Sequence, residues 1–479
     1  MSARPLFAAL TAIALVTACK KDATTSPLST SAYPTVTKVT VAPTAASIPV
    51  GATLQISVVF SDSAGNAVLG RSVGWKSSDT SVATVLPTGL VTGVGPGTAA
   101  ISATAIGTTL LPVASVTLKV AAVSRTLSFV SMNPGYLHTC GLATDGFVYC
   151  WGDNSHGQLG NAATSTTSPF RIADTLSLSF ASLSAGYQHA CGVTVTGAGY
   201  CWGDDNYGEL GSGTAAASLT AVAVAGSQTF QQVSAGYYYS CGLTTAGAAY
   251  CWGNNGYGAL GDSTTITRSA PVAVRGGLTL SSVRTGFYHT CGLTTSGIAY
   301  CWGLNDHGQL GNDTTVDSPV PVAIAGGVQF ASIAVGSYHA CGLAADGTAY
   351  CWGGNGNGQL GNGESTDAKR PVAVGGGLRF ASLSAGASYT CGVTVAGDAW
   401  CWGYNAYGQL GIGSGASETR LPAAVQGGLR FTSLVAGAYH TCGLAVGGTG
   451  YCWGNNVAGQ LGDGTRVANS RPAKVSGQP

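Results

Sequence analysis

The stretch HTCGLTTSGIAYCWGLNDHGQLG at residues 289–311 decides how most of this chain folds. Its two cysteines, Cys291 and Cys301, stand ten positions apart, and Trp302 follows the second one. The same arrangement recurs seven times along the chain, at intervals of 50 or 51 residues. A fixed period in this range is typical of solenoids, propellers and other repeat arrays.

Each repeat contains four segments with the character of short β-strands. In the fourth repeat they cover residues 280–283, 290–293, 299–302 and 320–324, and a Thr-Ser-Gly turn joins the second to the third. Four strands in each of seven repeats predict a seven-bladed β-propeller. Propellers often close by pairing strands from both ends of the ring. Residues 125–130 could therefore complete the last sheet, and the sequence leaves this open.

The recurring motifs point to a known family. Gly-x-x-His-Thr-Cys-Gly-Leu, Tyr-Cys-Trp-Gly and Gly-Gln-Leu-Gly resemble the regulator-of-chromosome-condensation repeat, over about residues 129–475. The resemblance implies a seven-bladed propeller. The best-known eukaryotic member of that family is an exchange factor for a nuclear GTPase that docks on chromatin. We do not expect that activity here, because an exported lipoprotein, as residues 1–19 predict, meets no such GTPase, and the basic histone-binding tail is also missing.

The paired cysteines predict disulfides within the repeats. A hairpin around residues 295–297 places Cys291 opposite Cys301, within disulfide reach, whereas free buried thiols are the alternative. Each bond closes a loop of about ten residues and is worth at most about 2.7 kcal/mol. No metal site is expected, since clustered Cys-x-x-Cys spacing is missing. The seven predicted pairs are Cys140–Cys150, Cys191–Cys201, Cys241–Cys251, Cys291–Cys301, Cys341–Cys351, Cys391–Cys401 and Cys442–Cys452.

The first residues have the pattern of an export signal. Arg4 precedes an apolar stretch at residues 6–16, which spans about 16 Å as a helix and is too short for a bilayer core of roughly 30 Å. Val-Thr-Ala-Cys at residues 16–19 resembles the lipobox of bacterial lipoproteins, which implies acyl chains on Cys19. Ordinary cleavage elsewhere is the alternative. We therefore expect an exported protein that is lipid-anchored in the bacterial cell envelope.

A different pattern fills residues 36–122. Short alternating segments such as residues 54–58, with turn signals every 8 to 12 residues, predict a β-sandwich. Trp75 in Trp-Lys-Ser-Ser-Asp and the segment Gly-Leu-Val-Thr-Gly-Val at residues 89–94 resemble the bacterial group-2 immunoglobulin-like domain. This stretch has no cysteine, so Trp75 and aliphatic side chains are expected to fill its core. The family implies a spacer or an adhesion module, and we favour a spacer.

The composition limits the classes of partner. The 479 residues include 20 Lys and Arg and 19 Asp and Glu, which leaves a net charge of +1 without any basic cluster. Nucleic acid is therefore not an expected partner. The predicted fold is all-β, with an N-terminal immunoglobulin-like sandwich followed by the propeller. The predicted parts are a signal peptide at residues 1–18, a Ser/Thr/Pro tether at 19–35, the sandwich at 36–122 and the propeller at 124–479.

Two groups of polar residues are candidates for catalysis. One position holds His138, His189, His289, His339 and His440, with Tyr239 and Tyr389 in the other two repeats. A residue that recurs in every repeat is expected to be a scaffold hydrogen-bonder. Asp204, Asp205 and Glu209 form the one acidic cluster, and it too is expected to be a turn rather than a glycosidase pair. No catalytic residue and no cofactor are predicted.

Aromatic residues concentrate in two loops of each repeat. Because successive strands run in opposite directions, the loop after the first strand and the loop after the third lie on the same propeller face. An Asn in the second loop hardly varies (Asp205 in repeat two), which suggests a hydrogen bond within the turn. The predicted binding face consists of Tyr136, Tyr187, Tyr207, Tyr237, Tyr238, Tyr257, Phe287, Tyr288, Tyr338, Tyr404, Tyr407, Tyr439, His156 and His307.

An uncharged face rich in tyrosine is suited to recognition of a protein or a carbohydrate. Alternatively, several of the rings pack between blades and are not accessible. The sequence thus favours a cell-envelope lipoprotein whose propeller binds a protein or a glycan, with membrane contact through the lipid anchor alone. A polysaccharide hydrolase or lyase is the alternative function, and a structural envelope protein without a specific ligand is a third.

Overall fold

The computed structural model describes residues 35–478 except 51, 107–112, 122–126, 163, 174–177 and 414. The predicted signal peptide, Cys19 and most of the tether lie outside the described residues. The chain divides into two compact units, residues 1–124 and 125–479. All the secondary-structure elements among the described residues are β-strands, so the predicted all-β fold is confirmed. Among these residues no helix is long and apolar enough to cross a membrane.

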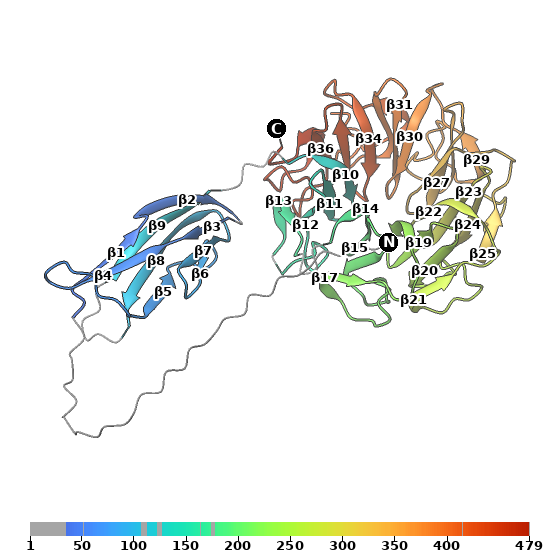
Figure 1. The fold of residues 1–479 in the computed structure, drawn as a ribbon. Coiled ribbons are helices and arrows are strands. Elements are labelled where there is room, and N and C mark those ends of the chain that lie inside the picture. The colour runs from blue at the N-terminus through green and yellow to red at the C-terminus, as the bar shows by residue number, and fades with distance from the viewer. Residues whose placement is uncertain are drawn as a thin grey trace, which may run out of the picture. The chain divides into compact units, whose positions relative to one another are not determined.

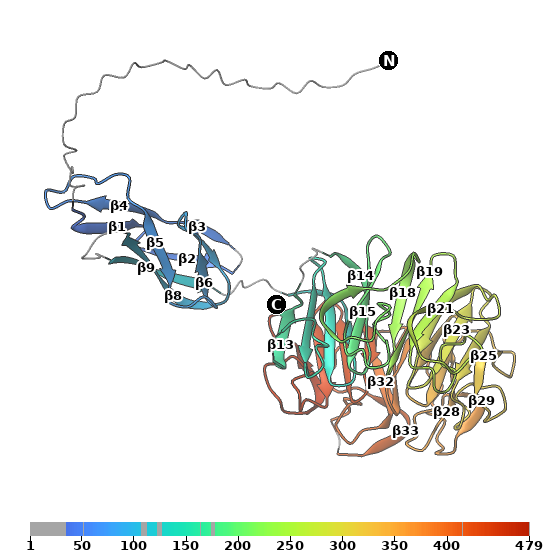
Figure 2. The same cartoon turned by 90° about the horizontal axis from the view of Figure 1, so that it is seen from below.

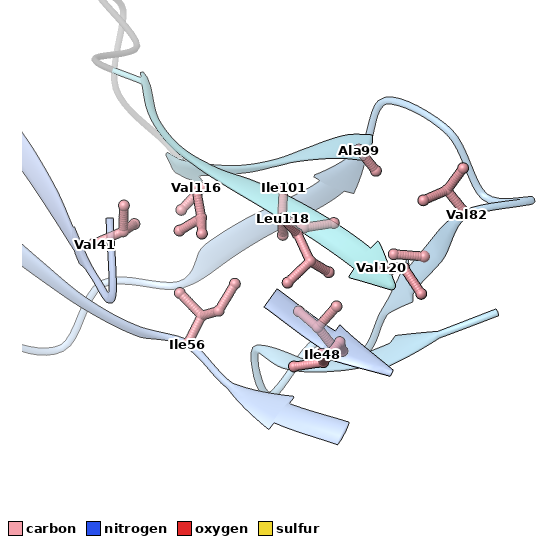
Figure 3. Close-up of a cluster of buried hydrophobic side chains, with 12 residues drawn as sticks. Val41, Ile48, Ile56, Val82, Ala99, Ile101, Val116, Leu118 and Val120 are labelled. Carbon is pink, nitrogen blue, oxygen red and sulfur yellow. The ribbon is translucent and has the colours of Figure 1, made fainter. Parts of the chain in front are cut away.

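The first unit is a β-sandwich built on aliphatic side chains. Val41, Ile48, Ile56, Ile101 and Leu118 point toward one another in its core (Figure 3). Trp75 is only partly buried and packs against this cluster, so the core is mainly aliphatic. The sheets are β2 (Ala45–Pro49), β9 (Val113–Ala121), β8 (Gly97–Ala105) and β5 (Val73–Ser77); β3 (Thr53–Gln55), β7 (Leu90–Gly93) and β6 (Ala83–Val85); and β1 (Lys38–Ala42) with β4 (Ser57–Ser61).

The second unit consists of seven four-stranded antiparallel sheets, here called blades 1 to 7. The first strands are β10 (Phe129–Pro134), β14 (Phe180–Ala185), β18 (Phe230–Ala235), β22 (Leu280–Thr285), β26 (Ser332–Val335), β30 (Phe380–Ala385) and β34 (Phe431–Ala436). The second strands are β11 (His138–Ala143), β15 (His189–Thr194), β19 (Tyr239–Thr244), β23 (His289–Thr294), β27 (His339–Leu343), β31 (Tyr389–Thr394) and β35 (His440–Ala445). The third strands are β12 (Val148–Gly152), β16 (Gly199–Gly203), β20 (Ala249–Gly253), β24 (Ala299–Gly303), β28 (Ala349–Gly353), β32 (Ala399–Tyr404) and β36 (Gly450–Gly454). The fourth strands are β13 (Thr166–Arg171), β17 (Ser218–Ala223), β21 (Arg268–Ala273), β25 (Ser318–Ala323), β29 (Ala368–Ala373), β33 (Glu418–Ala424) and β37 (Asn469–Lys474).

The blades follow one another around a closed ring (Figure 1 and Figure 2). The first strand of each blade contacts the first strand of the next blade, and β34 contacts β10. These seven strands are therefore the innermost ones and surround the propeller axis. The strand order within every blade follows the chain, so no blade is assembled from both ends of the chain.

The possibility that residues 125–130 complete the last sheet is wrong for the residues that the structure describes. Blade 7 takes its fourth strand from β37, and Phe129 and Val130 belong to blade 1. The backbone N–H of Leu127 donates to the carbonyl oxygen of Gly477 at 2.8 Å, outside the sheet. Side-chain packing also joins the last blade to the first, because Trp151 and Phe129 of blade 1 lie in one buried cluster with Leu461.

The predicted hairpin register is present in every blade. Cys291 lies opposite Cys301 in the β23–β24 pair, and the turn between them has Gly297 at a φ of 81°, a conformation that favours glycine. Seven disulfides join the predicted partners, with Cα–Cα distances of 4.0 to 4.1 Å. All of them lie within blades. The fourth strand of blade 4, β25, begins two residues before the predicted strand.

Buried tryptophans connect neighbouring blades. Trp202 is fully buried, and its Nε1–H donates to the carbonyl oxygen of Gln158 in the preceding blade at 3.0 Å. Six of the seven equivalent tryptophans make this bond. In five blades, a hydroxyl next to the first cysteine donates to the same carbonyl, as Ser240 does to Glu209 at 3.0 Å. The blades are thus held together by side chains that bond backbone groups of their neighbours.

Candidate binding face

The loop after the first strand of each blade begins with a glycine that the crowded axis requires. A Cβ atom on Gly186 would lie 2.5 Å from the carbonyl oxygen of Gly236 in the next blade, closer than real Cβ atoms approach oxygen. The residue after this glycine is fixed by the backbone, since the N–H of Tyr187 donates to the same Gly236 oxygen at 3.1 Å. Seven side chains are thereby placed around one end of the axis.

These seven side chains form an asymmetric ring. Four neighbouring blades contribute Tyr136, Tyr187, Tyr237 and Phe287, with ring centroids 4.3, 4.0 and 3.6 Å apart in succession. We call these four residues the aromatic crescent. The other three blades contribute the small side chains Ser337, Ala387 and Ala438. Crescent and small side chains together line a cavity of about 150 Å³ on the axis.

A second ring of aromatic residues lies further from the axis. Tyr207 in the loop after the third strand of blade 2 is 5.0 Å from Tyr238 of blade 3, and Tyr257 of blade 3 is 5.0 Å from Tyr288 of blade 4. These contacts confirm that the two loops share one face. Two further blade junctions have His307 with Tyr338 at 5.4 Å and Tyr407 with Tyr439 at 5.3 Å.

The structure brings together thirteen of the fourteen predicted residues. Each has a ring centroid within 6.5 Å of another member of the set, and the contacts link all thirteen into one network. His156 stands apart and hydrogen-bonds Ser155 instead. We call the thirteen residues the aromatic face: Tyr136, Tyr187, Tyr207, Tyr237, Tyr238, Tyr257, Phe287, Tyr288, His307, Tyr338, Tyr404, Tyr407 and Tyr439.

The aromatic face is accessible but partly desolvated. Tyr207, Tyr257 and Tyr407 are 41, 43 and 42 % exposed, and the other members are half-buried. Burial, followed by the neighbouring phenols, raises the pKa of Tyr136 to about 12. Burial likewise raises the pKa of Tyr288 to about 12. These two phenols therefore stay neutral and keep their O–H donors at physiological pH.

One member of the face has a hydrogen-bond partner that the sequence did not reveal. His307 Nδ1 lies 2.7 Å from a carboxylate oxygen of Asp367, in the equivalent loop of the next blade. Both side chains are partly exposed, so water competes for this contact. The two residues are 60 positions apart in the sequence. Their contact can be predicted only when it is known which residues of neighbouring blades face one another.

The recurring histidines lie beneath the face and serve the scaffold. All five are fully buried, and His189 Nε2 lies 2.8 Å from the hydroxyl oxygen of Ser240 in the next blade. His440 and His339 make the same bond to Thr139 and Thr390. The imidazoles of His138 and His289 have no hydrogen-bond partner among the described residues. Burial lowers the pKa of each imidazole, to about 4 for His138 and about 3 for the others.

Tyrosine replaces histidine at this position in blades 3 and 6. The Tyr389 hydroxyl donates to the carbonyl oxygen of His440 at 2.7 Å, and Tyr239 donates to His289 in the same way. Both rings are fully buried. The position is therefore a blade-to-blade connector, as the scaffold interpretation expects, and it has no access to a ligand.

The recurring asparagine holds its loop in shape. In each blade its side-chain oxygen accepts the backbone N–H five residues later, at 2.8 to 3.0 Å, as Asn305 does from Leu310. Asp205 makes the same bond to Leu210 at 2.9 Å. The expected turn hydrogen bond is thus present in all seven blades.

The acidic cluster is buried within the loop of blade 2. Asp204, Asp205 and Glu209 are 3, 0 and 0 % exposed. Glu209 Oε2 accepts the backbone N–H of Tyr207 at 2.8 Å, a bond that Gln makes in other blades. Burial raises the pKa of Glu209 to about 7, with smaller contributions from the two Asp charges. Within the described part of the chain, no group of three His, Cys, Asp or Glu is arranged to hold a metal ion.

Sequence profiles of known families match both units. The profile of the RCC1-like domain matches residues 107–391, more than half of the chain. Profiles of the regulator of chromosome condensation (RCC1) repeat match residues 396–444 and, separately, residues 380–409 and 431–460. The profile of the bacterial Ig-like domain (group 2) matches residues 35–109.

Individual relatives resemble parts of the chain. The probable E3 ubiquitin-protein ligase HERC4 of Rattus norvegicus is 36 % identical over 87 residues, which is 18 % of this chain and 8 % of that protein. Human WBSCR16 superimposes with a TM-score of 0.63 at 21 % identity, covering 68 % of this chain and 93 % of that one. Yeast RCC1 (Prp20), solved with Kap60 bound, gives 0.63 at 19 % identity, covering 74 % and 86 %. At these identities the structural likeness concerns the fold.

Proposed function

This chain belongs to the RCC1-like domain family, and from this premise we propose that its propeller is a protein-binding module whose contact surface is the aromatic face. The observation that carries the proposal is the network of thirteen aromatic rings on one end of the ring of blades. Tyrosine supplies a rigid amphipathic contact and is enriched among the residues that dominate protein–protein binding energy.

The propeller scaffold does not require these rings. At the position of the aromatic crescent, three blades have Ser337, Ala387 and Ala438 and still make the same fold. At the next position, Leu137, Gln188 and Ser388 stand where the other four blades have tyrosine. When a partner covers a half-exposed ring that the fold does not need, apolar surface is removed from water, and this favours binding. The position of the rings therefore favours a binding role over a packing role.

A structural neighbour gives modest support for this reading. Yeast Prp20 is solved in complex with another protein, Kap60. The likeness to that chain concerns the fold, so it shows that such a propeller can be held by a protein partner and no more. The choice of surface here depends on the aromatic face alone.

Attachment to a membrane is a separate part of the proposal. The Val-Thr-Ala-Cys motif at residues 16–19 supports acylation of Cys19, and the immunoglobulin-like domain would then act as a spacer between a bacterial membrane and the propeller. A Cys19→Ala variant should move the protein from the membrane fraction to the soluble fraction. Unchanged fractionation would reject the anchor and leave the binding proposal in place.

The binding proposal is tested by removing one pair of neighbouring rings. Full-length protein carrying Tyr257→Ala and Tyr288→Ala should keep its thermal midpoint within a few degrees, because both rings are partly exposed. It should capture proteins from a cell-envelope extract at least tenfold less well than the unchanged chain.

The matched control is Ser296→Ala, in the exposed turn at the opposite end of blade 4. It should not alter capture. Equal capture by the double variant, or loss of capture by the control alone, would show that another surface binds. Retention of an oligosaccharide on a glycan array, with no protein captured, would contradict the protein assignment.

A further inference from the structure

One cation lies on the inner wall of the propeller. Arg284, on β22, is the single ionisable residue of the seven first strands, all of which the structure describes. The equivalent positions in the other blades hold Asn133, Ser184, Ser234, Ala334, Ser384 and Val435.

The hydroxyl groups at this position have a structural use that Arg284 does not share. Ser184 Oγ accepts the backbone N–H of Ala235 in the next blade at 2.9 Å, and Ser384 does the same for Ala436. The side chain of Arg284 has no hydrogen bond or ion pair with any other residue that the structure describes. The guanidinium therefore does not hold neighbouring blades together.

Arg284 is both accessible and unfavourably placed. Its side chain is exposed to solvent, yet the surrounding protein lowers the pKa of the guanidinium through desolvation, with no acidic group to offset this. A cation that is partly desolvated without a counter-ion costs stability. Residues that lower stability without a structural return are concentrated at functional sites.

The position of Arg284 connects it to the cavity on the axis. The next residue, Thr285, lines that cavity together with the aromatic crescent and the small side chains Ser337, Ala387 and Ala438. Because β22 runs toward the aromatic face, Arg284 lies one residue deeper than Thr285, about 3.3 Å along the strand. Arg284 itself does not line the cavity, but its backbone is next to that of Thr285, so its long side chain starts close to a cavity whose mouth is on the aromatic face.

We propose that this cavity receives an acidic side chain of the protein partner, and that Arg284 is its counter-ion. The inference deepens the proposed function and rests on it. Arginine and a carboxylate can form two parallel charge-assisted hydrogen bonds, which fix the orientation of the bound group. The aromatic crescent would cover the aliphatic stem of the inserted side chain on one side of the cavity.

The lining of the cavity favours an amino-acid side chain over an acidic sugar. A volume of about 150 Å³ accommodates a group about the size of benzene. Most of the lining residues are glycine, alanine, valine and aromatic residues, so side-chain hydroxyl groups besides the tyrosines come from Ser337 and Thr285 alone, and the remaining polar groups belong to the backbone. A uronic acid ring would bury several hydroxyl groups, each of which needs a hydrogen-bond partner.

Arg284→Ser is a conservative test variant, because blades 2, 3 and 6 carry serine at this position. The full-length variant should fold and should have a higher thermal midpoint than the unchanged chain. A lower midpoint would show that Arg284 has a structural role and would overturn the argument from its missing partner.

The binding test uses a library of random heptapeptides displayed on phage and selected against the full-length protein. The unchanged chain should enrich peptides with Asp or Glu, and the selected peptides should bind Arg284→Ser at least tenfold more weakly. Arg284→Glu should reverse the preference toward Lys and Arg. The control Arg275→Ser removes an exposed arginine from the loop after β21, at the other end of the propeller, and should change nothing.

Each other outcome has a defined meaning. Peptides selected without an acidic preference, but lost in the Tyr257→Ala and Tyr288→Ala double variant, would overturn the role of Arg284 and leave the aromatic face as the binding surface. Selection of no peptide would overturn the acidic-side-chain proposal. Binding of an oligoglucuronate that depends on Arg284 would reject a protein ligand at this cavity.

Discussion

His189 Nε2 lies 2.8 Å from the hydroxyl oxygen of Ser240, so a fully buried imidazole of one blade is joined to the next blade. Ser240 donates its own proton to the Glu209 carbonyl oxygen, which assigns the Nε2–H of His189 as the donor to Ser240. The positions equivalent to Ser240 opposite His138 and His289 hold Ala190 and Ala340. These two imidazoles have no partner among the described residues for the same reason.

Supplying the missing hydroxyl should stabilise the propeller. Ala340→Thr gives His289 the partner that Thr390 gives His339, and it adds a donor for the carbonyl oxygen of Gln309. The expected gain in unfolding free energy is about 1 kcal/mol. Denaturant unfolding followed by tryptophan fluorescence measures it, since most tryptophans lie at blade junctions. Ala340→Val has the shape of threonine without the hydroxyl, and an equal gain from it would contradict the hydrogen-bond explanation.

Acid should destabilise the propeller through the five buried histidines. Burial lowers their pKa values to about 3 or 4 in the folded chain, whereas the unfolded chain takes up protons below a pKa of roughly 6.5. Stability is therefore full above that pH and falls as the pH drops toward 4. Each histidine should contribute a loss of about 2 kcal/mol at pH 5. Unfolding curves at several pH values test this.

The matched variant for the acid effect is His289→Tyr, which copies Tyr239 of the preceding blade and removes one titrating group. Its stability should depend less steeply on pH than that of the unchanged chain. A stability that stays constant between pH 6.5 and 4 would refute the role of the imidazoles.

Replacing Glu209, the buried acid of blade 2, should stabilise the propeller as the pH rises, whereas replacing a buried histidine stabilises it in acid. Burial raises the pKa of Glu209 to about 7, so its ionised form is unfavourable in the folded chain. Glu209→Gln should give no electrostatic gain below pH 4.5 and a growing gain up to pH 7, of about 1–3 kcal/mol at pH 8. The new amide can donate to Asp204, as Gln158 donates to Asp153 at 2.8 Å. The reverse change, Gln158→Glu, should destabilise the propeller above pH 5, and a gain from it would contradict this account.

Removing one disulfide should weaken its own blade without opening the ring. Cys291→Ala with Cys301→Ala should reduce the unfolding free energy by at most about 2.7 kcal/mol. Blade 4 remains joined to blade 3 because Trp302 Nε1–H donates to the Ala259 carbonyl oxygen at 2.9 Å. Circular dichroism should show an unchanged strand signal at 25 °C. Peptide mapping of the unchanged chain without reduction should recover Cys291 linked to Cys301, and links between repeats would reject the blade assignment.

The repeat made much of this fold predictable from sequence. The ten-residue cysteine spacing places Cys291 opposite Cys301, and the antiparallel strand order puts both aromatic loops on one face. The sequence also shows that alanine, at Ala190 and Ala340, replaces Ser or Thr in the repeats that follow His138 and His289. This replacement could not be interpreted there, because nothing in the chain says that residue 289 faces residue 340 of the next blade.

The cavity and its cation were less accessible to prediction. Whether a side chain in the first strand faces the axis depends on the tilt and twist of the blade, which the period does not determine. Phe287 and Ser337 occupy the same position of the repeat, and only closure of the ring places them around one cavity. The mode of closure itself stayed open in the sequence because both possibilities satisfy the same strand pattern.

The contact between the last blade and the first has a topological consequence. Trp151 Nε1–H donates to the Gln460 carbonyl oxygen at 2.9 Å, and Thr139 meets His440 at 2.8 Å, the same bonds that join successive blades elsewhere. The junction between blades 7 and 1 is thus held by the same bonds as the other junctions. The peptide connection between two blades keeps the chain continuous but adds no further kind of contact between them. The ring is in effect circular, so the chain could be cut at another junction and joined across the junction between blades 7 and 1 as a circular permutant with the same set of blade contacts.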